Sequence, residues 1–128
     1  MATEISSGIK VSVETFYQPS SDQLEPFQYI FAYRITISND SAFTVQLLKR
    51  HWYITDALGD IREVKGEGVI GEQPTIAPGN SYQYTSGCNF FTPIGRMEGS
   101  YLMERPKDGY LFYVKIPQFD MVAPFCLN

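Results

Sequence analysis

The chain has 128 residues, enough for one domain with a full hydrophobic core and too few for two. Its net charge of −4 and its ten scattered Lys and Arg residues argue against nucleic acid or an anionic membrane as a partner. Its apolar runs are too short to span a bilayer, and its first residues do not resemble an export signal, so we expect a cytoplasmic protein with reduced thiols at Cys88 and Cys126.

Apolar and polar residues alternate with period two along most of the chain, which predicts strands that bury one face. Seven strands are expected, over residues 9–17, 29–38, 43–55, 61–65, 81–86, 97–105 and 110–116. In the third strand Leu48, Trp52 and Ile54 share a face, and Trp52 is the expected buried tryptophan of the core. Turn-forming residues at 57–60 and 105–109 predict two hairpins.

Seven short strands without a convincing amphipathic helix predict an all-β fold. We expect a single domain over residues 1–128, built as an antiparallel β-sandwich of the immunoglobulin or fibronectin type III kind. A small β-barrel is the alternative.

The segment between the fourth and fifth strands contains glycines at the spacing of a dinucleotide fingerprint: Gly66, Gly68 and Gly71. That fingerprint requires a following helix, and prolines soon follow here, so glycines that allow a tight bend are the favoured interpretation. A nest of backbone amides for a phosphate is the alternative. Glu67 and Glu72 would repel bare phosphate, so a bridging Mg²⁺ would be needed.

Catalytic chemistry has little support in the sequence. His51 is the only histidine and lies within a strand, and no cation adjoins Cys88 to activate its thiol. Carboxylates that could loosely hold a hard cation surround one turn, but they are better explained as solvating it: Asp56, Asp60 and Glu63. We therefore expect no catalytic residues, no metal site, no cofactor and no enzymatic activity.

Apolar residues near loops suggest a protein partner. Phe90 and Phe91 follow the fifth strand, and residues 122–125 lie near the end of the chain, so both groups could form an exposed patch. Exposed strand edges also make a homodimer an alternative.

Several linked motifs resemble the ApaG family, also called CorD in cobalt-resistance contexts. They are the runs GEGVIGEQP at 66–74, IAPG at 76–79, YTSGC at 84–88, TPIGRMEGSY at 92–101 and RHWYITD at 50–56. The match covers nearly the whole chain.

This resemblance implies a fibronectin type III-like sandwich and a bacterial cytosolic protein linked to cobalt resistance and magnesium efflux. Related domains in eukaryotic F-box proteins serve in protein–protein interaction. The family's glycine-rich motif, with an inferred pyrophosphate-binding role, corresponds here to Gly66, Gly68 and Gly71. A protein-interaction module is therefore our first functional hypothesis. A domain that binds pyrophosphate or a nucleotide at residues 66–72 is the alternative.

Overall fold

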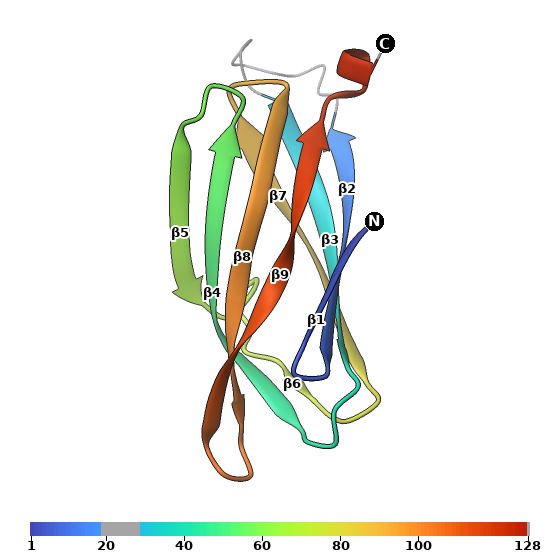
Figure 1. Cartoon of the computed structure of the whole chain (residues 1–128), viewed down its shortest axis with the longest axis vertical. Helices are drawn as coiled ribbons and strands as arrows, with labels where there is room; N and C mark the ends of the chain where they lie inside the picture. Colours follow the sequence, from blue (N-terminus) through green and yellow to red (C-terminus); the bar gives the residue numbers. More distant parts are fainter. Residues whose placement is uncertain (19–28, 128) are drawn as a thin grey trace.

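The computed structural model describes residues 1–18 and 29–127, and its strands form two antiparallel sheets (Figure 1). The strands are β1 (Ala2–Ser6), β2 (Ile9–Gln18), β3 (Tyr29–Asn39), β4 (Val45–Asp56), β5 (Ile61–Glu67), β6 (Thr75–Ile76), β7 (Ser81–Phe90), β8 (Ile94–Arg105) and β9 (Tyr110–Val122). A short 3₁₀ turn, Pro124–Leu127, follows β9. The described residues contain no helix that is long and apolar enough to cross a membrane.

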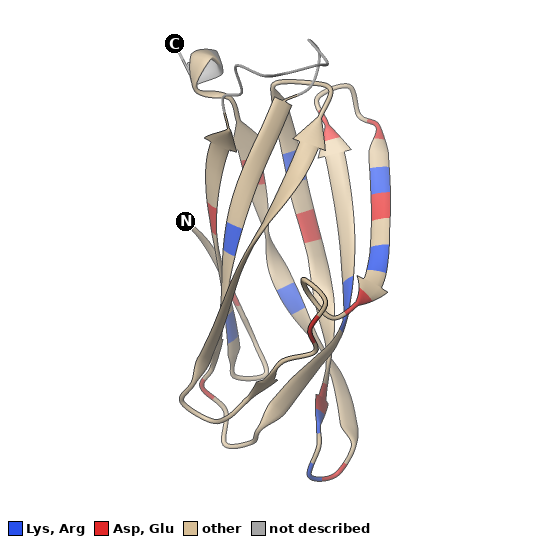
Figure 2. Ribbon diagram, turned by 180° about the vertical axis from the view of Figure 1, so that it is seen from behind, with Lys and Arg blue, Asp and Glu red and all other residues tan. Residues whose placement is uncertain are grey.

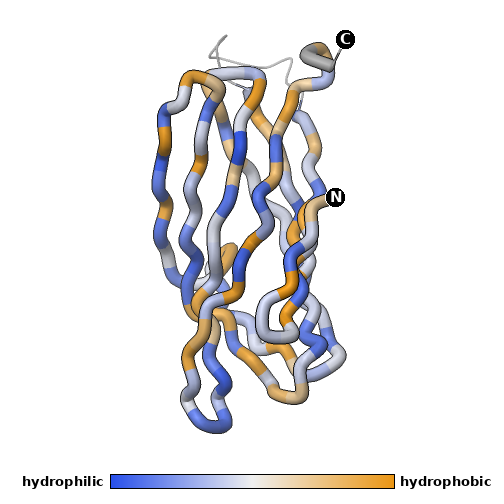
Figure 3. The backbone as a smooth tube through the Cα atoms, in the orientation of Figure 1, coloured by the Kyte–Doolittle hydropathy of each residue, from blue (hydrophilic) through white to orange (hydrophobic). Residues whose placement is uncertain are grey.

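The two sheets pack face to face as a sandwich. The first sheet has the order β1-β2-β3-β7, and the second has the order β5-β4-β8-β9 with β6 paired to the start of β4. Hydrophobic and hydrophilic residues alternate along the strands (Figure 3), and the hydrophobic ones fill the space between the sheets. Trp52 lies in this core, 3% exposed, against the rings of Tyr33 and Phe119. The predicted all-β sandwich and its buried tryptophan are confirmed.

All seven predicted strands are present, and the structure adds two short ones, β1 and β6. One predicted facing is wrong. A β-bulge between Leu47 and Lys49 reverses the alternation in β4, so Leu47 is fully buried and Leu48 only partly. The strand expected to end at Ile116 instead continues through Pro117 to Val122, past an irregularity in its register with β8.

The two lateral sides of the sandwich differ. On one side β9 packs against β1 and β2, and the backbone amide of Lys115 donates a hydrogen bond to Ser6 Oγ, 3.2 Å away. On the other side lie the edges of β5 and β7, which belong to different sheets. Figures 1 and 2 show β5 as the outermost strand of its sheet, with no strand of the other sheet facing it. We call this the open side.

Candidate functional site

The glycine-rich segment predicted as a ligand loop is a tight turn at the end of β5. Val69 and Glu72 exchange two backbone hydrogen bonds of 2.8 and 3.0 Å, and the two residues between them, Ile70 and Gly71, have φ angles of 49° and 74°. Positive φ at both central residues is the geometry of a type I′ turn, which favours glycine. Gly71 therefore has a conformational role in this turn.

Gly68 is required by a close backbone contact, and Gly66 leaves room for an arginine side chain. A side chain at Gly68 would lie 2.1 Å from the carbonyl oxygen of Glu72, and one at Gly66 would lie 2.7 Å from the guanidinium of Arg50. Arg50 Nη1 in turn donates hydrogen bonds to the carbonyl oxygens of Glu67 and Gly68, at 2.9 and 3.0 Å. The arginine of the RHWYITD motif and the glycine-rich motif thus form one packed unit.

The predicted ligand-binding residues lie together in this segment, but much of its backbone is already engaged. The amide of Gly68 donates to the carbonyl of Leu48, 2.8 Å away. The amide of Val69 donates to the carbonyl of Glu72, and the amide of Glu72 donates to the carbonyl of Val69. The Glu72 carboxylate accepts a hydrogen bond of 2.8 Å from Tyr82, which raises the tyrosine's pKa together with burial. These contacts give the glycines structural roles, and phosphate binding here stays a prediction.

A hollow of about 310 Å³ opens between the sheets on the open side. Its walls are Trp52, Ile54, Val64 and Met97 on the apolar part, and Tyr33, Arg50, Arg62, Ser86, Gly87, Cys88 and Asn89 on the polar part. We call this hollow the lateral cleft. Two arginines and no carboxylate line it among the residues that the structure describes, so the lateral cleft is electropositive.

Arg62 spans the mouth of the lateral cleft from β5 to β7. Its Nη2 atom donates to the carbonyl oxygen of Asn89 at 2.9 Å and lies 3.3 Å from Cys88 Sγ. Burial raises the pKa of the Cys88 thiol, and the neighbouring guanidinium lowers it by a smaller amount. The expectation that no cation adjoins Cys88 is therefore wrong, because Arg62 contacts its sulfur, but burial has the larger effect and the pKa of the thiol is raised overall.

Tyr33 lines the lateral cleft, and two further tyrosines, Tyr84 and Tyr101, are buried in the core. The hydroxyls of Tyr84 and Tyr101 hydrogen-bond to each other across the two sheets, and burial raises the pKa of both and of Tyr33. Arg50 acts in the opposite direction on all three by its positive charge. Tyr33 is therefore the tyrosine that contributes to the surface of the cleft, whereas the hydroxyls of Tyr84 and Tyr101 bind each other inside the core.

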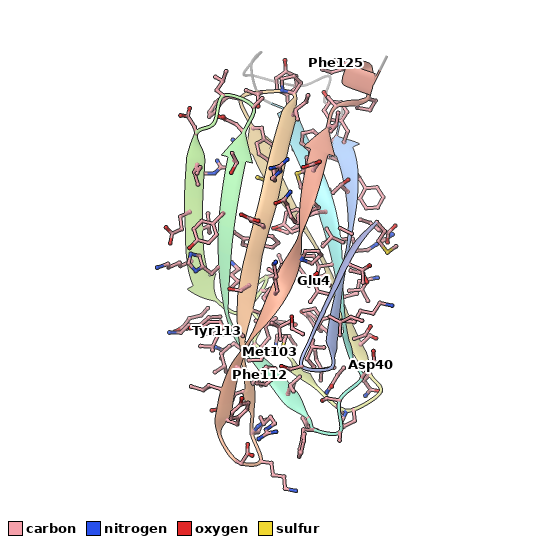
Figure 4. The ribbon with its side chains drawn as sticks, in the orientation of Figure 1. Glu4, Asp40, Met103, Phe112, Tyr113 and Phe125 are labelled. Atoms are coloured by element: carbon pink, nitrogen blue, oxygen red, sulfur yellow. The ribbon has the colours of Figure 1, made fainter. Side chains whose placement is uncertain are left out.

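A second hollow, of about 420 Å³, lies on the outer face of the second sheet between β5, β4, β8 and β9. Exposed Tyr113, labelled on β9 in Figure 4, contributes to its wall. Two of its lining residues contact the same carboxylate: His51 Nε2 lies 2.7 Å from Glu63 Oε1, and Lys65 Nζ lies 3.4 Å from that oxygen. These contacts lower the pKa of the exposed Glu63 carboxyl, that from His51 most. His51 therefore serves a surface hydrogen bond with Glu63.

The carboxylates of the β4–β5 turn and part of the expected apolar patch lie at the same end of the sandwich. Asp56 Oδ1 accepts the amides of Leu58 and Asp60, so its carboxylate shapes the β4–β5 turn, and the described residues contain no group of three or more potential metal ligands. Phe91 is 61% exposed at the same end of the sandwich, whereas Phe90 is buried. Leu58, Ile61 and Ile94 are also exposed there. The predicted thiol of Cys126 lies outside the described side chains.

Sequence reasoning missed the lateral cleft because its residues come from separate strands. No local pattern distinguishes Arg62, and Arg50 stands out only within the RHWYITD motif. The usable signal was a contrast in composition: β7 is a long strand without a charged residue, whereas β5 carries four, Arg62, Glu63, Lys65 and Glu67 (Figure 2).

The structure defines an immunoglobulin-like antiparallel β-sandwich with an open, arginine-lined side. The sequence pattern of the ApaG domain matches residues 19–105. The chain belongs to the ApaG domain family.

Relatives of this family match nearly the whole chain. Protein ApaG of Brucella anthropi is 49% identical and Protein ApaG of Brucella canis is 47% identical, each over 124 residues that cover 97% of this chain and 95% of the relative. A crystal structure described as an ApaA protein from Bordetella pertussis is 39% identical, has a TM-score of 0.85 and covers 96% of both chains. The predicted family is confirmed.

Proposed function

We propose that this chain is a non-catalytic protein-interaction module that adds an extended segment of a partner to the free edge of β7. Strand addition of this kind gives affinity through backbone hydrogen bonds and specificity through alternate side chains. A cytoplasmic location remains a prediction from the sequence. The implied link to cobalt and magnesium handling would then act through the partner.

The observation that carries this proposal is the edge of β7. This strand has ten residues, Ser81–Phe90, with no charge and no proline, and it pairs with β3 alone in the part of the chain that the structure describes. Edge strands are normally protected by charges, prolines, bulges or a covering element. β5, the other strand on the open side, has charged side chains along it, so β7 is the edge that supports pairing.

The backbone of β7 also has the orientation that strand addition requires. Its residues alternate between those bonded to β3 and those whose amide and carbonyl groups point away from β3. The amide of Asn39 donates to the carbonyl of Asn80, and the carbonyl of Asn89 accepts from Arg62 outside the sheet. Residues 83, 85 and 87 therefore direct their backbone groups toward the open side.

Apolar side chains near the end of β7 enlarge the surface available to a partner. Phe91 and Ile61 line a hollow of about 210 Å³ that shares Arg62 and Asn89 with the lateral cleft. A segment paired with β7 would therefore run toward these exposed residues. Burial of apolar side chains would add to the backbone hydrogen bonds.

A proline at position 85 tests the proposal. Thr85→Pro removes an edge-facing amide without removing a hydrogen bond to β3, and Thr85→Val keeps the amide as the matched control. Crosslinked pull-downs from native cytosol should recover partners with wild type and Thr85→Val and lose them with Thr85→Pro, whose fold is checked by urea unfolding. Equal recovery by all three chains would reject strand addition. If wild type sediments as a homodimer and Thr85→Pro does not, the segment that pairs with β7 belongs to a second copy of the chain.

A further inference from the structure

The first sheet ends one strand short on the open side. The inward face of β5 consists of Arg62, Val64 and Gly66, which pair with inward residues of β4. No strand of the first sheet lies opposite this face in either Figure 1 or Figure 2. A strand added to β7 would extend the first sheet into this position and close the lateral cleft.

The two arginines of the lateral cleft differ from the others in the chain. Three of the five arginines pair with carboxylates: Arg34 with Glu14, Arg96 with Asp120 and Arg105 with Asp108. Arg50 and Arg62 instead contact backbone carbonyls and a thiol, and neither forms an ion pair with a described residue. The positive charge at this cleft is therefore left without a matching anion.

We infer that the partner segment carries an acidic side chain, Asp or Glu, that enters the lateral cleft and pairs with Arg62. This acidic side chain is delivered by the strand addition proposed above, so its recognition rests on that function. Alternate side chains of the added strand would point inward, toward β5. A guanidinium can bind a carboxylate through two parallel hydrogen bonds, and covering the cleft would strengthen that pair.

The neighbouring inward residue of β5 defines a second feature of the partner. Val64 lies two residues after Arg62 in β5. It is half-buried and pairs with Trp52 of β4. Two residues along a strand span about 6.6 Å on both the partner and β5. The inferred recognition pattern is thus an acidic residue and an apolar residue separated by one position, with the acidic residue near the Asn89 end of β7.

Selection from a peptide display library tests this pattern. The probe is a library of randomised nine-residue peptides, selected on the intact chain. Peptides selected by the wild-type chain should share an acidic residue and an apolar residue separated by one position. Their binding should fall at least tenfold with Arg62→Gln, which keeps a donor for the carbonyl of Asn89, and should recover in part with Arg62→Lys. Changing the peptide's acidic Glu to Gln should weaken its binding by the same factor. Combining that change with Arg62→Gln in the protein should weaken binding no further.

The controls separate this inference from the proposed function. Lys115→Gln removes a positive charge on the opposite side of the sandwich and should leave binding unchanged. Peptides that bind through β7, as shown by their loss with Thr85→Pro, but show no acidic preference would overturn the inference and leave the proposed function standing. A library that yields no binder, or only binders insensitive to Thr85→Pro, would overturn both.

Discussion

Asn39 is a fully buried polar residue that joins three segments of the chain. Its side-chain amide donates to the carbonyl oxygens of Phe43 and Ile76, at 2.8 and 2.9 Å, and its side-chain oxygen accepts from the amide and the hydroxyl of Ser41. Buried polar groups are costly when they are left without partners. Asn39 therefore fixes the end of β3 to β6 and to the loop before β4.

Replacing Asn39 tests this role. Asn39→Ala leaves the buried carbonyl of Ile76 without its side-chain donor and removes one of the two donors to the carbonyl of Phe43, so we expect the free energy of unfolding to fall by roughly 2–4 kcal/mol. Urea denaturation measures the change. Ser38→Ala is the matched control, because the hydroxyl of Ser38 contacts only Ser81 at the surface. A loss no greater than that of the control would contradict this assignment.

Cys88 should titrate above the range of an ordinary cysteine. Burial raises the pKa of its thiol, and Arg62 offsets part of that effect. Arg62→Gln should therefore raise the thiol's pKa further. The ¹³Cβ shift of Cys88, followed against pH in a Cys126→Ser chain, measures both values. A pKa at or below that of the unfolded chain would contradict the dominance of burial, and no change with Arg62→Gln would contradict the contact between the guanidinium and the thiol.

At the residue scale the sequence indicated which residues are buried in the core better than it indicated which residues form hydrogen bonds with each other. Trp52 and the tyrosines of the strands were recognisable because core aromatic residues alternate with polar ones. The sequence gives no sign of the role of Asn39, because nothing local distinguishes a solvated turn residue from a buried one whose side chain donates two hydrogen bonds and accepts two. Arg62 was missed for a similar reason, since its contacts are with residues far along the chain.

The glycine-rich turn shows how local geometry limits function at the scale of an element. Three of its amides donate to protein carbonyls, which leaves few for an anion. We therefore expect no heat when pyrophosphate alone is titrated into the chain. Calorimetry with Mg²⁺ present tests the alternative, in which Glu67 and Glu72 hold a bridging cation. Binding that requires Mg²⁺ and disappears in Glu67→Gln would support that alternative, and binding of pyrophosphate without Mg²⁺ would contradict our expectation.

Strands were predictable where the alternation is regular and were misjudged where it is interrupted. The bulge near Leu48 changes which residues face inward, and Pro117 appeared to end a strand that in fact continues along an edge, where proline is tolerated. β1 was missed although Ile5 and Ala2 lie in it, because the strand pairs at the edge of the sheet and remains partly exposed. Register depends on the partner strand, which the sequence does not specify locally.

At the scale of the whole molecule, the asymmetry of the two lateral sides connects the fold with the proposed function. One side is closed by β1 against β9, where Ser6 accepts the amide of Lys115. The other side presents the uncharged edge of β7 and an electropositive cleft. Among the described strands, the uncharged edge of β7 is the one that the proposed strand addition would use, and its place on the open side would make binding directional.

Hydrogen exchange distinguishes the two sides directly. The amides of Thr85 and Gly87 face away from β3, so they should exchange rapidly in the native state, whereas the amides of Tyr84 and Ser86 should be strongly protected by the ladder. The amide of Lys115, bonded to Ser6 on the closed side, should exchange more slowly than that of Thr85. NMR-detected exchange at single residues measures all five rates, and Ser6→Ala should accelerate Lys115 alone. Equal protection along consecutive residues of β7 would show that its edge is already occupied, and would remove the basis for strand addition.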